Sequence, residues 1–427
     1  MDRNDKRYIN YIKILKEELV AAMGCTEPAA IAFAAARARE ELGAIPERIE
    51  ARVSGNIVKN VRSVVVPNTG GLRGIKASVA AGIIAGISSK KLEVIAGADK
   101  EKLDKIKCYL DSTPIEVMMS QSERVFEIDI GVWKDNLSAR VVITDSHTNI
   151  TRIEKNGKII FEAPALPEST DTEKQLLSVE SAIDFAETAA LEDVKPVIER
   201  QIEYNTAISR EGLANNWGAN IGKTLLSGSE GGVNLAARAA AAAGSDARMA
   251  GCEMPVIILS GSGNQGMTAS LPVIEYAAAL HSSRETLIRA LVLSSLVTVH
   301  LKAGIGRLSA YCGVVSAGAA AGAGIAFLHG GRMDAISHTI VNALAITSGI
   351  VCDGAKPSCA AKIAAAVDAG ILGWMMFKNG QQFYRGEGLV SNGLEKTIAN
   401  ISRLGKEGMR KTDKEIIAIM LNDDKAL

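Results

Sequence analysis

Three cysteines in the C-terminal part of the chain are the residues whose type and spacing most directly indicate chemistry. Cys312 stands alone, while Cys352 and Cys359 flank a short segment that contains glycine and proline. Three thiolates can ligate three irons of an iron–sulfur cube and leave the fourth iron open as a Lewis acid. Such a centre is typical of a lyase rather than of an electron carrier. The alternative is that all three are buried packing residues, as most free cysteines are.

The spacing of the last two cysteines favours a cluster over a zinc ion. Paired cysteines in zinc sites usually stand about two to four residues apart, whereas six residues separate Cys352 from Cys359. A wider gap suits a cluster, because its irons are spread over a larger volume. Spacing alone leaves the packing alternative open. Cys108 and Cys252 are expected to be core or helix-surface residues without a role.

A further cysteine, Cys25, directly precedes a predicted helix whose first turn is Thr26-Glu27-Pro28. The partial positive charge at a helix N-terminus lowers the pKa of a thiol and favours the thiolate, which Glu27 partly opposes. Cys25 is therefore a candidate base, nucleophile or metal ligand. The alternative is a cysteine in a capping loop that takes no part in chemistry.

The segment Ser260–Gly266 is the strongest loop signal in the chain. It follows an apolar run and precedes a predicted helix that starts near Met267. Closely spaced glycines expose backbone N–H groups, and a helix N-terminus adds positive potential. The loop has neither the glycine spacing of a dinucleotide site nor the lysine of a P-loop. We expect Ser262, Asn264 and Gln265 to bind a small anion such as an amino-acid carboxylate; the alternative is a plain helix-entry turn.

Polar side chains also cluster beside predicted strands in the first third of the chain. Amide, hydroxyl, ammonium and imidazole groups together are suited to substrate binding. The alternative is a set of ordinary turns, because Asn, Ser and Gly are turn residues. The substrate-binding candidates in these clusters are Ser54, Asn56, Lys59, His147, Thr148 and Asn149.

The elements that must position these residues divide the chain into three stretches. Helical periodicity over residues 7–42 predicts two helices, and Val- and Ile-rich segments at 47–66 and 115–161 predict strands, with two more helices between them. The remainder is almost entirely helical. We therefore predict an α+β fold class with two domains. These are a large all-helical domain that carries an iron–sulfur site, formed by residues 1–44 and 166–427, and an inserted α+β domain at 45–165.

Composition and charge exclude several classes of protein. Lys and Arg together number 48, as do Asp and Glu, so no net charge recruits nucleic acid or an anionic membrane. Six cysteines do not form a disulfide framework in a chain of 427 residues. The N-terminus lacks an apolar segment, and the most lipid-like run, residues 312–328, is weakly apolar and short for a membrane span. We expect a cytoplasmic protein that acts on a small-molecule amino-acid substrate and has no nucleic-acid or membrane partner. The sequence does not determine the oligomeric state, and a homodimer is possible.

Together, these motifs resemble those of the L-cysteine desulfidase family. That family is related to the iron–sulfur L-serine dehydratases and includes members of uncharacterised function. The resemblance covers nearly the whole chain. The segments that carry it are Gly24–Pro28, Ser54–Ile57, His147–Asn149, Gly261–Gly266 and Cys352–Cys359.

The resemblance implies an oxygen-sensitive enzyme with a [4Fe-4S] cluster that converts L-cysteine to pyruvate, ammonia and sulfide. It implies Cys312, Cys352 and Cys359 as the three protein ligands, one open iron, and Cys25 as an active-site residue. The serine dehydratases space their cysteine pair more widely and carry a C-terminal cysteine that can occupy the fourth iron. The tail of this chain has no cysteine. That difference favours the desulfidase branch, or leaves the fourth iron to water, substrate or Cys25.

The mechanism expected from these residues is β-elimination without pyridoxal phosphate. The open iron would bind the substrate, the Ser262–Gly266 loop and Lys59 would hold its carboxylate, and Cys25 as a thiolate would remove the Cα proton. Three alternatives stay open. They are L-serine dehydration at the same site, a non-catalytic iron–sulfur sensor or amino-acid-binding protein, and a pyridoxal-phosphate lyase, against which the helical pattern argues.

Overall fold

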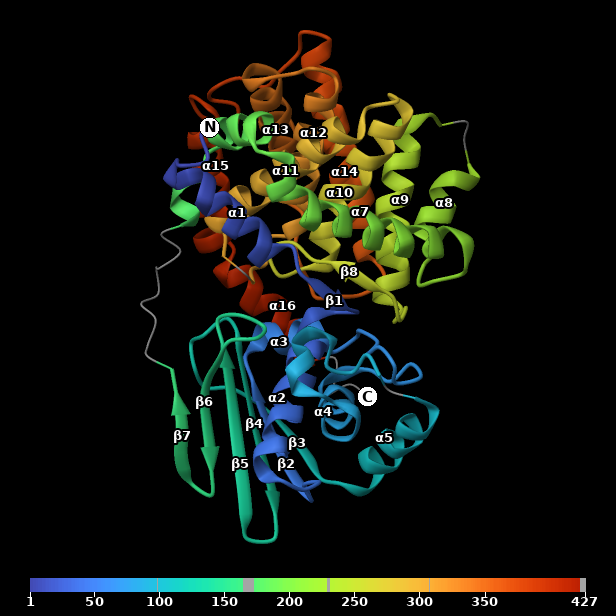
Figure 1. Ribbon diagram of the computed structural model, residues 1–427, viewed down its shortest axis with the longest axis vertical. Coiled ribbons are helices and arrows are strands. Elements are labelled where there is room, and N and C mark those ends of the chain that lie inside the picture. The colour runs from blue at the N-terminus through green and yellow to red at the C-terminus, as the bar shows by residue number, and fades with distance from the viewer. Residues whose placement is uncertain (98, 164–172, 229–230, 307, 423–427) are drawn as a thin grey trace.

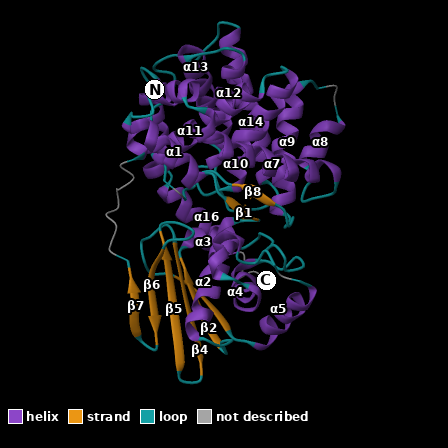
Figure 2. Ribbon diagram, in the orientation of Figure 1, coloured by secondary structure: helices purple, strands orange, loops and turns teal. Residues whose placement is uncertain are grey.

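The computed structural model describes the chain except for residues 98, 164–172, 229–230, 307 and 423–427 (Figure 1). One unit is almost entirely helical, and the other combines a six-stranded sheet with helices (Figure 2). Each unit has its own large hydrophobic core. The predicted α+β fold class is confirmed. The boundary predicted at residues 165–166 falls outside the described residues.

The helical unit is built from both ends of the chain. It also contains a pair of antiparallel strands, β1 (Ala21–Met23) and β8 (Pro255–Ile257), in segments where no strand was expected. Its helices are α1 (Lys6–Glu18), α6 (Val179–Thr188), α7 (Leu191–Ala214), α8 (Ile221–Ser227), α9 (Val233–Met249), α10 (Gly263–Ala279), α11 (Arg284–Ala303), α12 (Gly313–Leu328), α13 (Met333–Thr347), α14 (Cys359–Lys378), α15 (Leu394–Arg403) and α16 (Arg410–Asn422).

Glycines let α12 and α14 cross at short distance. A Cβ atom added to Gly318 would lie 2.4 Å from the carbonyl oxygen of Ala366, and one added to Gly370 would lie 2.2 Å from the carbonyl oxygen of Gly318. Real Cβ atoms do not approach a carbonyl oxygen so closely, so any larger residue would push the two helices apart. The small-residue composition of these segments therefore fixes how the two helices lie against each other.

Two helices, α11 and α14, are long and apolar enough to cross a membrane by length and composition alone. Their most apolar 18-residue windows are 78% and 50% buried inside the protein, and both helices contribute to the larger core. Packing within the protein therefore accounts for much of their apolar composition. The run at residues 312–328, noted in the sequence, forms α12, whose interior is buried throughout.

The second unit contains a mixed sheet with strand order β3-β2-β4-β5-β6-β7, in which only β2 and β3 run parallel. Helices lie against one face (Figure 1). The strands are β2 (Arg48–Val53), β3 (Ile115–Met119), β4 (Glu127–Lys134), β5 (Leu137–Thr144), β6 (Ile150–Lys155) and β7 (Lys158–Glu162). The helices are α2 (Thr26–Leu42), α3 (Gly55–Val61), α4 (Gly74–Ala85) and α5 (Lys100–Ser112).

Helix α2 packs in a different place from the one that we predicted. The sequence assigned residues 1–44 to the helical domain, yet most of the buried residues of α2 belong to the core of the sheet unit. The reason is its run of alanines, which lets α4 and the sheet approach closely: a Cβ at Gly82 would lie 2.3 Å from the carbonyl oxygen of Ala32. The N-terminus of α2 therefore stands where the two units meet.

The strand predicted over residues 47–66 is also shorter than expected. The strand β2 ends at Val53, and Ser54, in extended conformation, is the N-cap of the short helix α3. Glycine and asparagine after Ser54 interrupt the alternation of apolar residues that a strand requires. The polar residues of this segment therefore lie on a buried helix.

The C-terminal helix α16 ties the two units together by packing on α3 (Figure 1). The ammonium group of Lys59 lies 2.5 Å from Oδ1 of Asp413, and the amide of Asn56 donates to Oδ2 of the same carboxylate at 2.8 Å. Lys59 is almost fully buried. A buried charge requires such a partner, so this contact fixes the position of α3 against the end of the chain.

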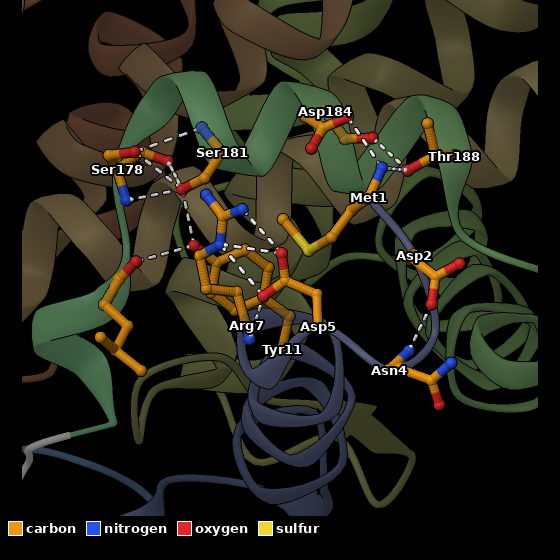
Figure 3. A network of polar contacts seen from close by, with 11 residues as sticks. Met1, Asp2, Asn4, Asp5, Arg7, Tyr11, Ser178, Ser181, Asp184 and Thr188 are labelled. Carbon is orange, nitrogen blue, oxygen red and sulfur yellow. Dashed lines mark hydrogen bonds and ion pairs between the residues drawn. The ribbon is translucent and has the colours of Figure 1, made fainter.

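The N-terminus is held against α6 by a polar network (Figure 3). The terminal amino group of Met1 donates to Asp184 at 2.9 Å and to Thr188 at 2.7 Å, and the hydroxyl of Tyr11 lies 2.6 Å from that of Ser181. These contacts hold α1 in place in the helical unit. The chain then passes through β1 and enters the site at Cys25.

Candidate active site

A cavity of about 100 Å³ lies where the two units meet. The sheet unit contributes the start of α2, the end of α3 and the loop between β5 and β6. The helical unit contributes the starts of α10, α12 and α14 and the segments between them. The polar, charged and sulfur-containing residues of the lining include Cys25, Glu27, Asn60, His147, Arg248, Ser262, Asn264, Gln265, Lys302, Tyr311, Cys312, Cys352, Cys359 and Lys362.

The three C-terminal cysteines all line this cavity, although the first and the last are 47 positions apart in the sequence. An isolated β-bridge between Tyr311 and Val351 joins their two segments. The backbone N–H of Cys312 donates to Ile350 at 3.2 Å, and that of Cys352 donates to Ala310 at 2.6 Å. Cys359 follows as the first residue of α14. The structure therefore brings the three cysteines to one cavity, and their role as cluster ligands stays a prediction.

The three thiols are close enough to influence one another. Burial, with smaller contributions from Cys352 and Cys359, raises the pKa of Cys312 to about 12. Within the described part of the chain, no three His, Cys, Asp or Glu residues converge tightly enough to hold a single metal ion. A cubic iron–sulfur cluster requires donors that are spread apart, because each donor ligates a different iron. Cys312, Cys352 and Cys359 bring three sulfur donors to one cavity, which is the number that a cluster with one open iron would use.

Four helices begin at the cavity, and each directs backbone N–H groups toward it. The N-cap residues of α2, α10 and α12 are Cys25, Ser262 and Cys312, and α14 begins at Cys359. Helix N-termini carry partial positive charge and favour bound anions. The side chains of Arg248, Lys302 and Lys362 add full positive charges to the lining. The cavity is therefore suited to an anionic ligand group such as a carboxylate.

Cys25 and Glu27 form a buried hydrogen-bonded pair. The thiol of Cys25 donates to Oε2 of Glu27 at 3.0 Å, and Thr26 donates to the same oxygen at 3.1 Å. The amide of Asn60 donates to Oε1 of Glu27 at 3.1 Å, and Nε2 of His147 lies 3.8 Å from that oxygen. Glu27 is the one acidic side chain in the described lining.

The two members of this pair differ in protonation. Burial raises the pKa of the Cys25 thiol well above its ordinary value, and the charge of Glu27 adds to this effect, with Arg248 opposing it. Burial also acts to raise the pKa of Glu27, but the attraction of His147 and the hydrogen bond from Cys25 outweigh it and lower this pKa to about 2. Cys25 is therefore a thiol beside a carboxylate at neutral pH. The expectation of a thiolate from helix position alone is wrong, because desolvation exceeds the helix-terminus effect.

The Ser260–Gly266 loop enters α10 as expected. Ser260 and Gly261 both have positive φ, at 49° and 79°, which turns the chain sharply before the helix. The carbonyl oxygen of Gly261 accepts a hydrogen bond from Thr26 at 3.0 Å. The side-chain oxygen of Asn264 accepts from Arg248 at 3.0 Å. The helix begins at Gly263 rather than near Met267, so Ser262 lines the cavity as the N-cap of α10, and Asn264 and Gln265 line it from the first turn.

Five predicted substrate-binding residues do not line the cavity. Lys59 and Asn56 bind Asp413, as described above. The hydroxyl of Ser54 donates to the carbonyl oxygen of Val125 at 2.9 Å and accepts from the backbone of Glu127. The amide of Asn149 donates to the carbonyl oxygen of Thr144 at 3.1 Å. Thr148 is also absent from the lining, whereas its neighbour His147 belongs to it.

Sequence reasoning missed several residues of the site, notably Glu27, Asn60 and Arg248. Glu27 was noted only as an acid in a helix first turn, and Asn60 only as part of a polar cluster. Arg248 lies near the end of the Ala-rich helix α9 and belongs to no motif. Its near-complete burial in contact with Gly24 and Asn264 is a property of the fold. The helix also carries Arg238 and Asp246, so the sequence offered no signal that singled out Arg248.

Comparison with known proteins defines the family. The family model described as serine dehydratase alpha chain matches residues 89–418, and the chain belongs to this family. It is 61% identical to a UPF0597 protein of Desulfitobacterium hafniense over 424 residues, which cover 99% of each chain. It is 50% identical to a UPF0597 protein of Lachnoclostridium phytofermentans, with 97% of this chain and 100% of the relative covered. The resemblance to a family related to the serine dehydratases is confirmed, and the names of these two relatives state no substrate.

Proposed function

We propose that this protein is an iron–sulfur-dependent lyase that eliminates the β-substituent of a small L-amino acid. The proposed substrate is L-cysteine, and the products are pyruvate, ammonia and hydrogen sulfide. The observation that carries the proposal is one cavity lined by three cysteines from the helical unit and by the buried Cys25–Glu27 pair from the start of α2. Membership of the serine dehydratase alpha chain family supports elimination as the reaction type.

Cys312, Cys352 and Cys359 would hold a [4Fe-4S] cluster. Bound through three protein ligands, such a cluster supplies a Lewis-acidic iron that has no protein ligand. The helix N-termini around the cavity stabilise the negative charge of the ligating thiolates. A cytoplasmic location is part of the proposal, because a reducing compartment keeps the thiols available.

The Cys25–Glu27 pair would move the protons of the reaction. Glu27, ionised at neutral pH, accepts the Cα proton of the substrate. Cys25, which holds its proton, donates it to the departing sulfur, so that hydrogen sulfide leaves. Glu27 then passes its new proton to the Cys25 thiolate across their 3.0 Å contact, which restores the resting pair. This sequence of transfers replaces the thiolate base expected from the sequence.

The start of α10 would bind the substrate carboxylate. Backbone N–H groups at a helix N-terminus suit an anion, and Arg248 adds a buried positive charge next to Asn264. The eliminated aminoacrylate tautomerises to an imine and hydrolyses in water, so no further catalytic group is required. The proposed division of labour leaves Lys59 with a structural role.

Anaerobic purification tests the proposal directly. Iron and acid-labile sulfide are counted per chain, and release of sulfide and pyruvate from L-cysteine is then measured. We expect about four irons per chain, as a [4Fe-4S] centre requires, and activity that is lost with the cluster on exposure to air. A protein that holds no iron and still eliminates sulfide contradicts the proposal.

L-Serine dehydration is the second candidate, because the name of the matched family model states serine dehydratase. The same cavity and the same proton pair would serve a hydroxyl leaving group. Measuring kcat/KM for L-cysteine beside L-serine in one preparation separates the two. A protein that carries the cluster but eliminates from neither substrate would instead favour a sensor or amino-acid-binding role.

A further inference from the structure

Asn60 belongs to the lining of the cavity, and one end of its amide has no hydrogen-bond partner among the described residues. Its nitrogen donates to Oε1 of Glu27 at 3.1 Å. A carboxylate accepts hydrogen bonds and cannot donate one when ionised, so this contact fixes which end of the amide is nitrogen. Its oxygen is buried and has no hydrogen-bond partner among the described residues. Asn60 is only 6% exposed, and it lines the cavity.

A buried acceptor without a partner is costly, so an occupied site should supply a donor. The nearest charged group identifies the kind of donor. Glu27 is held ionised beside Asn60, and it is the one acidic side chain in the described lining. The cationic side chains Arg248, Lys302 and Lys362 belong to the helical unit. His147 also lies 3.8 Å from Glu27, yet Glu27 makes the sheet side the part of the lining that can attract a positive ligand group, while the helical side favours negative groups.

We propose that Asn60, oriented by Glu27, accepts a hydrogen bond from the α-ammonium group of the substrate and thereby selects amino acids over 2-hydroxy acids. This inference rests on the proposed function, because it assigns one end of the substrate of that site. It also places the Cα atom, which bears both the ammonium group and the acidic proton, next to Glu27. The same amide would therefore serve recognition and bring the reacting C–H bond to its base.

The test uses unreactive probes, so that binding is measured apart from turnover. L-Alanine has no leaving group at Cβ, and L-lactate differs from it only in carrying a hydroxyl in place of the ammonium group. Isothermal titration of both ligands into the anaerobic holoenzyme gives their affinity ratio. We expect wild-type protein to bind L-alanine more tightly by about 10- to 100-fold, the range for a lost hydrogen bond to a charged group. Equal affinities overturn the proposal without any variant.

Two variants sharpen the result. Asn60→Leu should weaken L-alanine binding by about 10- to 100-fold while changing L-lactate binding much less. Asn56→Leu is the matched control, because Asn56 lies on the same helix, is similarly buried and also has an oxygen without a partner, but stays outside the cavity. It should leave the affinity ratio unchanged.

The two proposals fail in different ways. If the holoenzyme eliminates from neither L-cysteine nor L-serine but still binds L-alanine through Asn60, the proposed function fails and the ammonium site stands. If elimination proceeds and folded Asn60→Leu protein keeps the wild-type ratio of L-alanine to L-lactate affinity, the ammonium site is overturned alone. Circular dichroism and thermal unfolding establish that each variant is folded before titration.

Discussion

The two sides of the cavity differ in chemistry and in how the chain builds them. The helical unit supplies sulfur and positive charge, through Cys312, Cys352 and Cys359 together with three cationic side chains. The sheet unit supplies the acid, an amide and an imidazole, through Glu27, Asn60 and His147, and α2 adds the thiol of Cys25. One side is suited to hold a metal cluster, and the other is suited to move protons and bind an ammonium group.

In the proposed reaction, cofactor binding and proton transfer would therefore rest on two separate hydrophobic cores. The cysteine side depends on helix starts and on glycines that let α12 and α14 cross closely. The proton side depends on burial, which keeps a thiol protonated beside an ionised carboxylate. Variants on one side should therefore remove the cluster, while variants on the other should stop turnover and leave the cluster in place.

The largest effect is expected on the cysteine side. Replacing Cys312, Cys352 or Cys359 by serine should abolish cluster and elimination together, because a hydroxyl is a poor ligand for iron in a cluster. Iron, acid-labile sulfide and sulfide release are measured in the same preparation. Cys108→Ser, at an exposed position, and Cys252→Ala, at a buried position outside the cavity, are the controls and should keep both. Full activity in any of the three serine variants would contradict the assignment of that cysteine as a cluster ligand.

The next effect should appear on the proton side with the cluster intact. Glu27→Gln and Cys25→Ala should each lower kcat by about 10²- to 10⁴-fold, the usual contribution of a general acid or base. Exchange of the substrate Cα proton with deuterium oxide distinguishes them. Glu27→Gln should lose exchange, whereas Cys25→Ala should retain it and fail at release of sulfide. If exchange is lost only in Cys25→Ala, the thiol is the base and the proposed roles are reversed.

A smaller effect separates a structural from a substrate-binding role for Lys59. Asp413→Ala leaves the buried ammonium group of Lys59 without its partner and should lower the free energy of unfolding by about 3 kcal/mol. Thermal unfolding and KM are measured together. We expect the midpoint to fall and KM to stay within a few-fold of wild type. A large rise in KM with unchanged stability would instead assign Lys59 a role in substrate binding.

An effect on stability of similar size, spread over a pH range, compares two buried carboxylates. Burial raises the pKa of Asp246 to about 6, although backbone donors such as Gly222 oppose this, whereas the pKa of Glu27 is lowered. Folded protein therefore binds the Asp246 proton more tightly than unfolded protein does. As pH rises from about 4 to about 7, this group should lower stability by about 3 kcal/mol.

Urea unfolding at both pH values checks this expectation. Asp246→Asn should remove that loss, because the amide does not titrate and its oxygen can still accept from Gly222, which lies 3.0 Å from the carboxylate. An identical pH dependence in both proteins would contradict it. Glu27→Gln should remove a pH dependence of stability that has the opposite sign. Its wild-type contribution is present above about pH 4.5 and is lost as pH falls toward about 2.

The sequence predicted those features that depend on local pattern. The helix start after Cys25 and the loop before α10 could be inferred from glycines and capping residues, whereas the grouping of three cysteines was implied by the family resemblance. The structure places all of them around one cavity. The fold class could be inferred for the same reason, because strand and helix periodicity are local.

Features that depend on distant partners could not be predicted. Lys59 looked like a substrate ligand because nothing nearby in the chain neutralises it, yet its partner Asp413 is 354 residues away. The protonation of Cys25 depends on burial between two units, which outweighs the helix terminus visible in the sequence. Arg248 contributes only because α9 directs it to Gly24 and Asn264.

One spectrum tests the central claim most directly. Protein loaded with ⁵⁷Fe under anaerobic conditions is examined by Mössbauer spectroscopy before and after addition of L-cysteine. A cluster held by Cys312, Cys352 and Cys359 alone should show two iron environments in a ratio of about three to one, and only the minority component should change on addition of L-cysteine. A spectrum with four equivalent irons that does not change on addition of L-cysteine would contradict the account, as would protein without a cluster.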